Sequence, residues 1–252
     1  MVVDDTADDL STALNPWRDR LQLRVVRSST RGSPGANRNF GVAESQADLL
    51  LFVDADDTVC SKYIKAMVDA LESHPFVCSR VELSSLNPES RSSHPQSRGL
   101  ITAELGFLPF AGSGTLGIRR SLFTEMGGFA SSLPCYEEAD LCWRIQLSGH
   151  DPPYWVRDAV LNYRSPRATV FGTHSRWRRA FAFGRVQPLL YRRFRGMGMP
   201  RSTGRALAEL VQLCWRLGRG FVTGNPARGM RQLAAVKMGR IFGSIKYRVL
   251  YL

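Results

Sequence analysis

The feature that most constrains the fold is a continuous apolar run, Leu49-Leu-Leu-Phe-Val53, which stops at the acidic cluster Asp54-Ala-Asp-Asp57. Such a run is typical of a strand covered on both faces, because neither face then needs polar side chains. Residues 61–73 follow with apolar side chains at helical spacing, so a strand-to-helix unit closes there. Repetition of this unit predicts an α/β domain with a mixed, mainly parallel sheet and flanking helices.

The preceding residues show the same alternation. Residues 1–3 are typical of the end of a strand that feeds a loop, and residues 21–26 alternate as a second strand does. A glycine-rich turn then leads to a helix predicted over residues 36–45. Ser33 is placed to cap this helix, and Pro34 suits its first position.

Further helices are predicted later in the chain. One begins at Arg120, and another spans residues 136–149 with three acids in its first turn, where they complement the positive end of the helix dipole. Helices over residues 203–218 and 229–249 carry apolar stripes opposite Arg and Lys.

Charge divides the chain into two parts. Residues 176–252 hold 17 Lys and Arg and a single acid, Glu209, a net charge of +16, whereas residues 1–175 hold 17 bases and 21 acids, a net charge of −4. We therefore expect a catalytic domain over residues 1–175 and a basic amphipathic helical extension over residues 176–252. The extension is suited to polyanions such as anionic lipid or nucleic acid.

Composition narrows the cellular setting. No apolar run approaches the roughly 20 residues that cross a bilayer, and the acidic N-terminal residues do not resemble a signal peptide. The five cysteines are scattered and form no C-x-x-C pair, which favours reduced, buried thiols over a zinc or redox centre. We predict a cytoplasmic protein, either soluble or peripheral on the inner face of the cell membrane.

Two acidic groups carry the candidate chemistry. Asp54 and Asp56 follow the buried strand, where ligands bind in open α/β sheets, and their oxygens can hold a divalent cation against a diphosphate. Glu137, Glu138 and Asp140 stand at the start of a helix. Each group alone has a simpler interpretation, since acids also begin turns and favour helix N-termini.

Four motifs in one order make the chain similar to the family 2 inverting glycosyltransferases, which have the GT-A fold. The motifs are Gly35-Ala-Asn-Arg-Asn-Phe-Gly41, Leu51-Phe-Val-Asp-Ala-Asp-Asp57, Gly127-Gly-Phe129 and Glu137-Glu-Ala-Asp-Leu-Cys-Trp-Arg144. The resemblance covers about residues 1–175 and implies transfer of a sugar from a nucleotide-sugar donor to an acceptor hydroxyl, with inversion. The implied acceptor is a glycan or a lipid-linked molecule.

The resemblance also implies roles for single residues. Asp4 and Asp5 match the acids that contact the nucleoside, and Arg38 matches an arginine near the donor. Asp54 and Asp56 match the D-x-D motif, whose cofactor is a divalent cation, Mg²⁺ or Mn²⁺.

The acids at the later helix start match the family's Glu-Asp pair, of which the second member is the general base. Glu138 is therefore the first choice for this base and Asp140 the second, with Glu137 beside them. His174 is a candidate third metal or phosphate contact, although a lone histidine is more often a surface or packed residue. Trp143 and Trp155 suit either core packing or stacking on a sugar.

The chain departs from the family at its start, because the family's initial strand and helix have no counterpart before Val2. The alternatives are a start placed too late, a fragment, or a partner that completes the sheet. Two functions follow: an active transferase, or an inactive relative that binds a membrane surface or polyanion through residues 176–252. The stripes of those residues suit packing on the catalytic domain or docking on an anionic membrane, and nucleic acid is disfavoured because no recognisable nucleic-acid module accompanies the charge.

Overall fold

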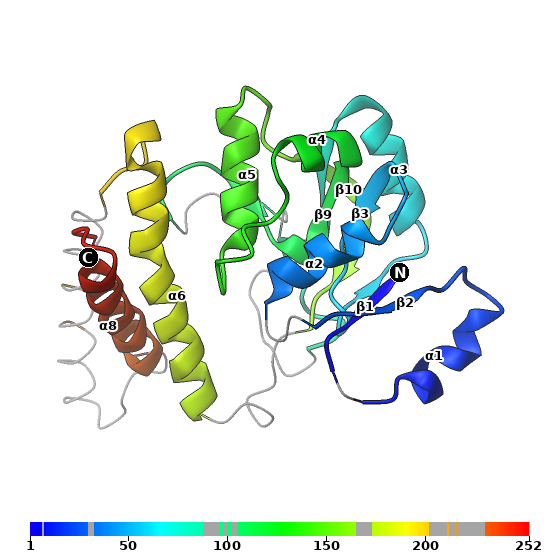
Figure 1. Cartoon of the computed structure of the whole chain (residues 1–252), viewed down its shortest axis with the longest axis horizontal. Helices are drawn as coiled ribbons and strands as arrows, with labels where there is room; N and C mark the ends of the chain where they lie inside the picture. Colours follow the sequence, from blue (N-terminus) through cyan, green and yellow to red (C-terminus); the bar gives the residue numbers. More distant parts are fainter. Residues whose placement is uncertain are drawn as a thin grey trace. The chain divides into compact units, whose positions relative to one another are not determined.

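A computed structural model of the chain describes residues 1–6, 8–29, 33–87, 96–97, 100–101, 105–164, 173–201, 211, 215 and 230–251. The chain divides into two compact units (Figure 1). The first comprises Met1–Leu100 and Phe110–Tyr163, and the second comprises Ile101–Pro109 and Arg164–Leu252. The boundary predicted at residue 175 therefore falls inside the second unit.

The first unit holds a mixed six-stranded sheet. Along its main path the strand order is β3-β9-β5-β10-β4, with β6 paired to β5. The strands are β3 (Leu49–Leu51), β4 (Thr58–Val59), β5 (Phe76–Glu82), β6 (Gln96–Ser97), β9 (Leu116–Arg119) and β10 (Tyr154–Asn162). A separate parallel pair consists of β1 (Val2–Asp4) and β2 (Val25–Arg27). Short strands β7 (Leu100–Ile101) and β8 (Phe110–Ala111) precede the turn η1 (Ser113–Thr115).

The mixed α/β class is confirmed, but the expectation of mainly parallel pairing was wrong for the described strands. Only β1–β2 and β5–β10 are parallel among the pairs with a described register, whereas β3–β9, β5–β9, β4–β10 and β5–β6 are antiparallel. Two of these four antiparallel pairs come from β9, which lies between β3 and β5 and runs against both. Alternation of strands and helices predicts parallel neighbours only where a helix crosses directly to the next strand.

Among the described residues, the first unit contains five helices. They are α1 (Ser11–Arg18), α2 (Pro34–Ala43), α3 (Tyr63–Ser73), α4 (Arg120–Glu125) and α5 (Glu137–Leu147). The predicted start of α2 is confirmed, because the Ser33 hydroxyl accepts a hydrogen bond from the Ala36 amide and Pro34 opens the helix. Helix α1 was not predicted, since it contains Pro16 and buries none of its residues.

The core of the first unit lies between the helices and the sheet. In Figure 1, α3 and α4 lie beside β10 and β9. Helix α3 buries Tyr63, Met67 and Leu71 against Val77 and neighbouring strand residues.

Trp143 is fully buried on α5 and meets Phe110 edge to face, which confirms the core interpretation of this tryptophan. Trp155 is half-buried on β10. Cys78 and Cys142 are buried free thiols, and burial raises the pKa of Cys78 to about 12, as the prediction of unreactive cysteines requires.

The described part of the second unit includes the helices α6 (Thr173–Phe194) and α8 (Met230–Lys246), with the turn η2 (Arg195–Met197) after α6. Helix α8 confirms the prediction over residues 229–249, whereas the helix predicted over 203–218 lies outside the described residues. Helix α6 was not predicted, because Pro188 and closely spaced arginines interrupt its apolar pattern. In the described part of the chain, no helix is both long enough and apolar enough to cross a membrane.

Candidate functional site

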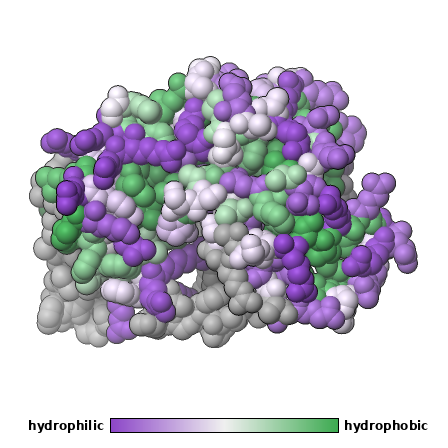
Figure 2. Space-filling view, viewed as in Figure 1, coloured by the Kyte–Doolittle hydropathy of each residue, from purple (hydrophilic) through white to green (hydrophobic). Residues whose placement is uncertain are grey.

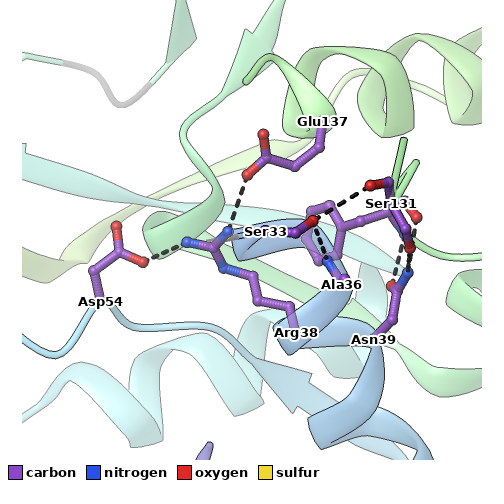
Figure 3. A network of polar contacts seen from close by, with 8 residues as sticks. Ser33, Ala36, Arg38, Asn39, Asp54, Ser131 and Glu137 are labelled. Carbon is purple, nitrogen blue, oxygen red and sulfur yellow. Dashed lines mark hydrogen bonds and ion pairs between the residues drawn. The ribbon is translucent and has the colours of Figure 1, made fainter. Parts of the chain in front are cut away.

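Arg38 on α2 joins the two acidic motifs. Its guanidinium donates to Oδ1 of Asp54 at 2.5 Å and to Oε1 of Glu137 at 3.1 Å (Figure 3). The Arg38 side chain is only 16% exposed and that of Glu137 only 5%, so water screens their ion pair weakly. Carboxylates far apart in the sequence therefore meet around one partly buried cation.

The loop before α5 is tied to α2 by Asn39. Its side-chain amide donates to the carbonyl of Phe129 at 2.8 Å and accepts from the amide of the same residue at 2.9 Å. It also donates to the Ser131 hydroxyl, and Ser33 donates to the Ser131 carbonyl (Figure 3). The Arg38 guanidinium lies 5.8 Å from the Phe129 ring centre, within the range of a cation–π contact. The Gly-Ala-Asn-Arg-Asn and Gly-Gly-Phe motifs are thus parts of one clamp, which sequence analysis had not connected.

The start of α5 is shaped by an unusual backbone conformation. Tyr136, directly before the helix, is buried. Its backbone adopts the left-handed conformation at φ 62°, a strained conformation for a residue other than glycine. Opposite it, a Cβ added to Gly35 would lie 3.1 Å from Cγ of Glu137, so α2 approaches α5 closely. This geometry aims Glu137 at Arg38.

Glu138, the predicted general base, is next to this ion pair and half-buried. Desolvation of its carboxyl group, followed by the negative charge of Glu137, raises the pKa of Glu138 to about 8. Arg38 opposes the shift only partly. A carboxyl group with a pKa near neutrality is suited to accept a proton from a hydroxyl.

Asp140, the second choice for the base, does not fit that role. It is fully buried, and its Oδ2 accepts from Nε of Arg144 at 2.8 Å. Arg144 also donates to the carbonyls of Met126 and Gly128. Asp140 therefore orients Arg144, which binds the backbone carbonyls of Met126 and Gly128. Because Asp140 is fully buried, an acceptor hydroxyl has no access to its carboxylate.

Asp4 and Asp5 lie where β1 ends. The Asp4 carboxylate is buried and accepts from the backbone and hydroxyl of Thr6, hydrogen bonds that lower the pKa of Asp4. The Asp5 carboxylate accepts from the Asn37 side chain at 2.8 Å, which places it beside α2. Asp4 shapes the turn, and Asp5 is the better placed of the two for a ligand.

Two of the three predicted metal ligands belong to the same loop. Asp54 is half-buried and paired with Arg38, whereas Asp56 is exposed. The described residues contain no cluster of three or more His, Cys, Asp or Glu side chains that could hold a metal ion. The side chain of His174 lies outside the described residues, so its role stays a prediction.

A cavity of about 550 Å³ borders Asp54 and Arg38. Its other walls are mostly apolar and come from β1, α2 and β3. Among the described strands, β1 pairs only with β2 and β3 only with β9, and this cavity lies between the two.

The sequence profile of glycosyl transferase family 2 matches residues 1–127. The chain belongs to this family. Two solved structures share the GT-A fold with it: a mannosyltransferase from Pyrobaculum calidifontis in complex with GDP-Man and Mn²⁺, and S. aureus TarS 1-349 in complex with UDP-GlcNAc. Their TM-scores are 0.57 and 0.51, at 18% and 17% identity. The alignments cover 96% and 100% of this chain, and 76% and 83% of theirs.

Curated relatives of this glycosyltransferase family member are longer than the chain. An uncharacterized glycosyltransferase of Haemophilus influenzae is 22% identical over 186 residues, which is 68% of this chain and 60% of the relative. The pre-mycofactocin glycosyltransferase of Mycobacterium tuberculosis is 30% identical over 189 residues, 68% of this chain and 37% of the relative. The chain therefore spans less than two thirds of the length of either.

Proposed function

We propose that the chain transfers a sugar from a nucleoside-diphosphate sugar to an acceptor hydroxyl, with inversion at the anomeric carbon. The observation that supports this best is the bridge from Asp54 through Arg38 to Glu137, because it brings the D-x-D motif and the Glu137-Glu138 pair to one site. Family membership and the nucleotide sugars bound by the two similar structures agree with it.

The residues would divide the reaction between them. Glu138 accepts the proton of the acceptor hydroxyl while its oxygen bonds to the anomeric carbon. The bond from that carbon to the diphosphate breaks on the opposite side, and the nucleoside diphosphate leaves with the electron pair. In this proposal Arg38, a fixed cation between the two acidic motifs, contacts the diphosphate, and Asp5, which accepts a hydrogen bond from Asn37 on α2, contacts the nucleoside.

The acids present fit Mg²⁺ or Mn²⁺. Both ions prefer hard oxygen ligands, and Mg²⁺ is usually held by one or two carboxylates together with substrate phosphates. Asp54 and Asp56, two residues apart after β3, supply such a pair of carboxylates. When bound there, the ion would neutralise the charge that develops on the leaving diphosphate.

The test is hydrolysis or transfer from a panel of nucleotide sugars, with Mn²⁺, with Mg²⁺ and with a chelator. Glu138→Gln and Asp56→Ala should each lower the rate by about 100-fold or more, since each removes a group that acts in the transition state. Glu72→Gln and Asp69→Ala are matched controls on α3, outside the site, and should keep the parental rate. Equal rates in all five proteins would refute the proposal.

Two finer parts of the proposal concern place and acceptor. A hexose donor and a glycan or lipid-linked acceptor would suit an enzyme that is cytoplasmic or peripheral on the inner face of the cell membrane. Activity on a lipid-linked acceptor that exceeds activity on its water-soluble analogue would support this part. Failure here would leave the transfer reaction itself untouched.

A further inference from the structure

Helix α8 exposes a regular apolar stripe. Met238, Ile241, Phe242 and Ile245 follow at intervals that place them on one helix face, and they are 43% to 72% exposed. Figure 2 shows hydrophobic residues scattered among hydrophilic ones on the visible face of the molecule, as is normal for a protein surface. The α8 stripe differs because four large apolar side chains recur with helical spacing.

The second unit fixes the direction in which this stripe points. A Cβ added to Gly239 would lie 2.2 Å from the Phe181 carbonyl oxygen, and one added to Gly184 would lie 2.1 Å from that of Val236. The backbones of α6 and α8 therefore touch along this seam. Arg240 is buried on the same side and donates to Gln187 at 2.6 Å. Rotating α8 to bury the stripe against α6 would break this contact and push apart a glycine-packed seam.

Aromatic side chains of α6 extend the stripe. The ring centroids of Phe242 and Phe181 are 5.6 Å apart. Phe181 stacks on Trp177, with 5.3 Å between their ring centroids. Trp177 is half-buried. Aromatic side chains that join an apolar body to a polar edge are enriched at membrane interfaces.

Basic residues border the stripe on both sides. At 3.6 residues per turn, Lys237 lies on one side of the stripe and Lys246 on the other. The side chains of Lys246 and Arg248 are exposed. Residues 176–252 carry a net charge of +16 with a single acid. Long basic side chains can lay their methylene groups along an apolar surface while their charges reach lipid phosphates.

We propose that the α8 stripe docks on an anionic lipid bilayer, with Met238, Ile241, Phe242 and Ile245 at the boundary between headgroups and acyl chains and Lys237 and Lys246 against lipid phosphates. An apolar helix face bordered by lysines matches such a surface in both hydrophobicity and charge. This docking goes beyond the transfer reaction and does not depend on it.

The experiment is flotation of the full chain with vesicles of neutral phosphatidylcholine, or of phosphatidylcholine with phosphatidylglycerol, across a salt series. Binding is expected to the anionic vesicles only, and to weaken as salt rises. Ile245→Ser should lower the partition coefficient by about tenfold. Its matched control is Ile64→Ser, since Ile64 on α3 is 65% exposed against 72% for Ile245, and this variant should bind like the parent.

The charge part of the proposal has its own matched pair. Lys246→Gln should weaken binding to anionic vesicles about fivefold, whereas Lys62→Gln, an exposed lysine beside α3, should not. Circular dichroism and thermal unfolding establish that each variant is folded. Rates with a water-soluble acceptor should be the same for Ile245→Ser and the parent, so failure of docking and failure of transfer are read separately.

Three outcomes would overturn the proposal. One is no binding to anionic vesicles at low salt. Another is equal binding by the parent and Ile245→Ser, because charge alone would then account for it. The third is a dimer of the parent that Ile245→Ser converts to a monomer, since a second copy would then cover the stripe.

Discussion

Removing the Arg38 guanidinium should destabilise the chain much more than removing a comparable surface arginine. In Arg38→Met, the Glu137 carboxylate, 5% exposed, loses its counter-charge, and Asp54, 39% exposed, loses a 2.5 Å hydrogen bond. Breaking a buried pair by removing one partner costs about 3–5 kcal/mol, and the exposure of Asp54 lowers this to about 3 kcal/mol. Most of this loss of stability comes from the buried carboxylate of Glu137, which keeps its negative charge without a counter-charge.

A second arginine provides a control. Arg24 pairs with Glu44 at 2.7 Å, but the two side chains are 59% and 37% exposed. Such a pair contributes about 0–1 kcal/mol, so Arg24→Met should shift stability by less than about 1 kcal/mol. The assay is urea unfolding at pH 7, extrapolated linearly to water.

Two tests separate the loss of charge pairing from the loss of packing in Arg38→Met: lowering the pH, and adding the substitution Glu137→Gln. Protonation neutralises a stranded carboxylate, so the penalty of Arg38→Met should shrink between pH 7 and pH 5. Adding Glu137→Gln to Arg38→Met should recover part of the loss at pH 7 for the same reason. A penalty for Arg38→Met that equals that of Arg24→Met, or that ignores pH, would refute the reasoning.

Four further predictions test other parts of the structure. The proposed base Glu138 would act only when deprotonated, and its pKa is raised to about 8, so kcat/KM should rise with pH toward a midpoint near 8, well above the ordinary value for glutamate. A flat profile would contradict this. Because of the same shift, the folded chain keeps a proton on Glu138 between about pH 4.5 and pH 8, where the unfolded chain releases it. The free energy of unfolding should therefore fall as the pH rises through this range. In urea unfolding, Glu138→Gln should lack that decline. Asn39→Ala, which removes the clamp on Phe129, should lower stability by about 2 kcal/mol, whereas Asn15→Ala on exposed α1 should change it by less than about 0.5 kcal/mol, measured by thermal unfolding. Gly184→Ala should cost about 1–3 kcal/mol by forcing α6 from α8, and Gly196→Ala, with open space around it, should be nearly neutral; equal melting temperatures would contradict the close seam.

Much of the first unit could be predicted because local signals and tertiary structure agree there. The Ser33 cap, the Pro34 start of α2 and the buried run of β3 each follow from chemistry within a few residues. The position of β9 could not be predicted in this way. Its neighbours β3 and β5 are distant in sequence, and no pattern within a strand specifies which partner it takes or in which direction.

The candidate site shows the same division. Motif order placed Asp54 and Glu138 in one site, and local composition placed the acids at strand and helix ends. What the order could not supply is the contact that holds them together. Arg38 satisfies two carboxylates through one guanidinium, and only the approach of α2 to the start of α5, allowed by Gly35, brings it within reach of both. Because that approach depends on packing between elements about a hundred residues apart, it becomes visible only in three dimensions, and it turns Arg38 from one motif residue among several into the residue on which the site's geometry depends.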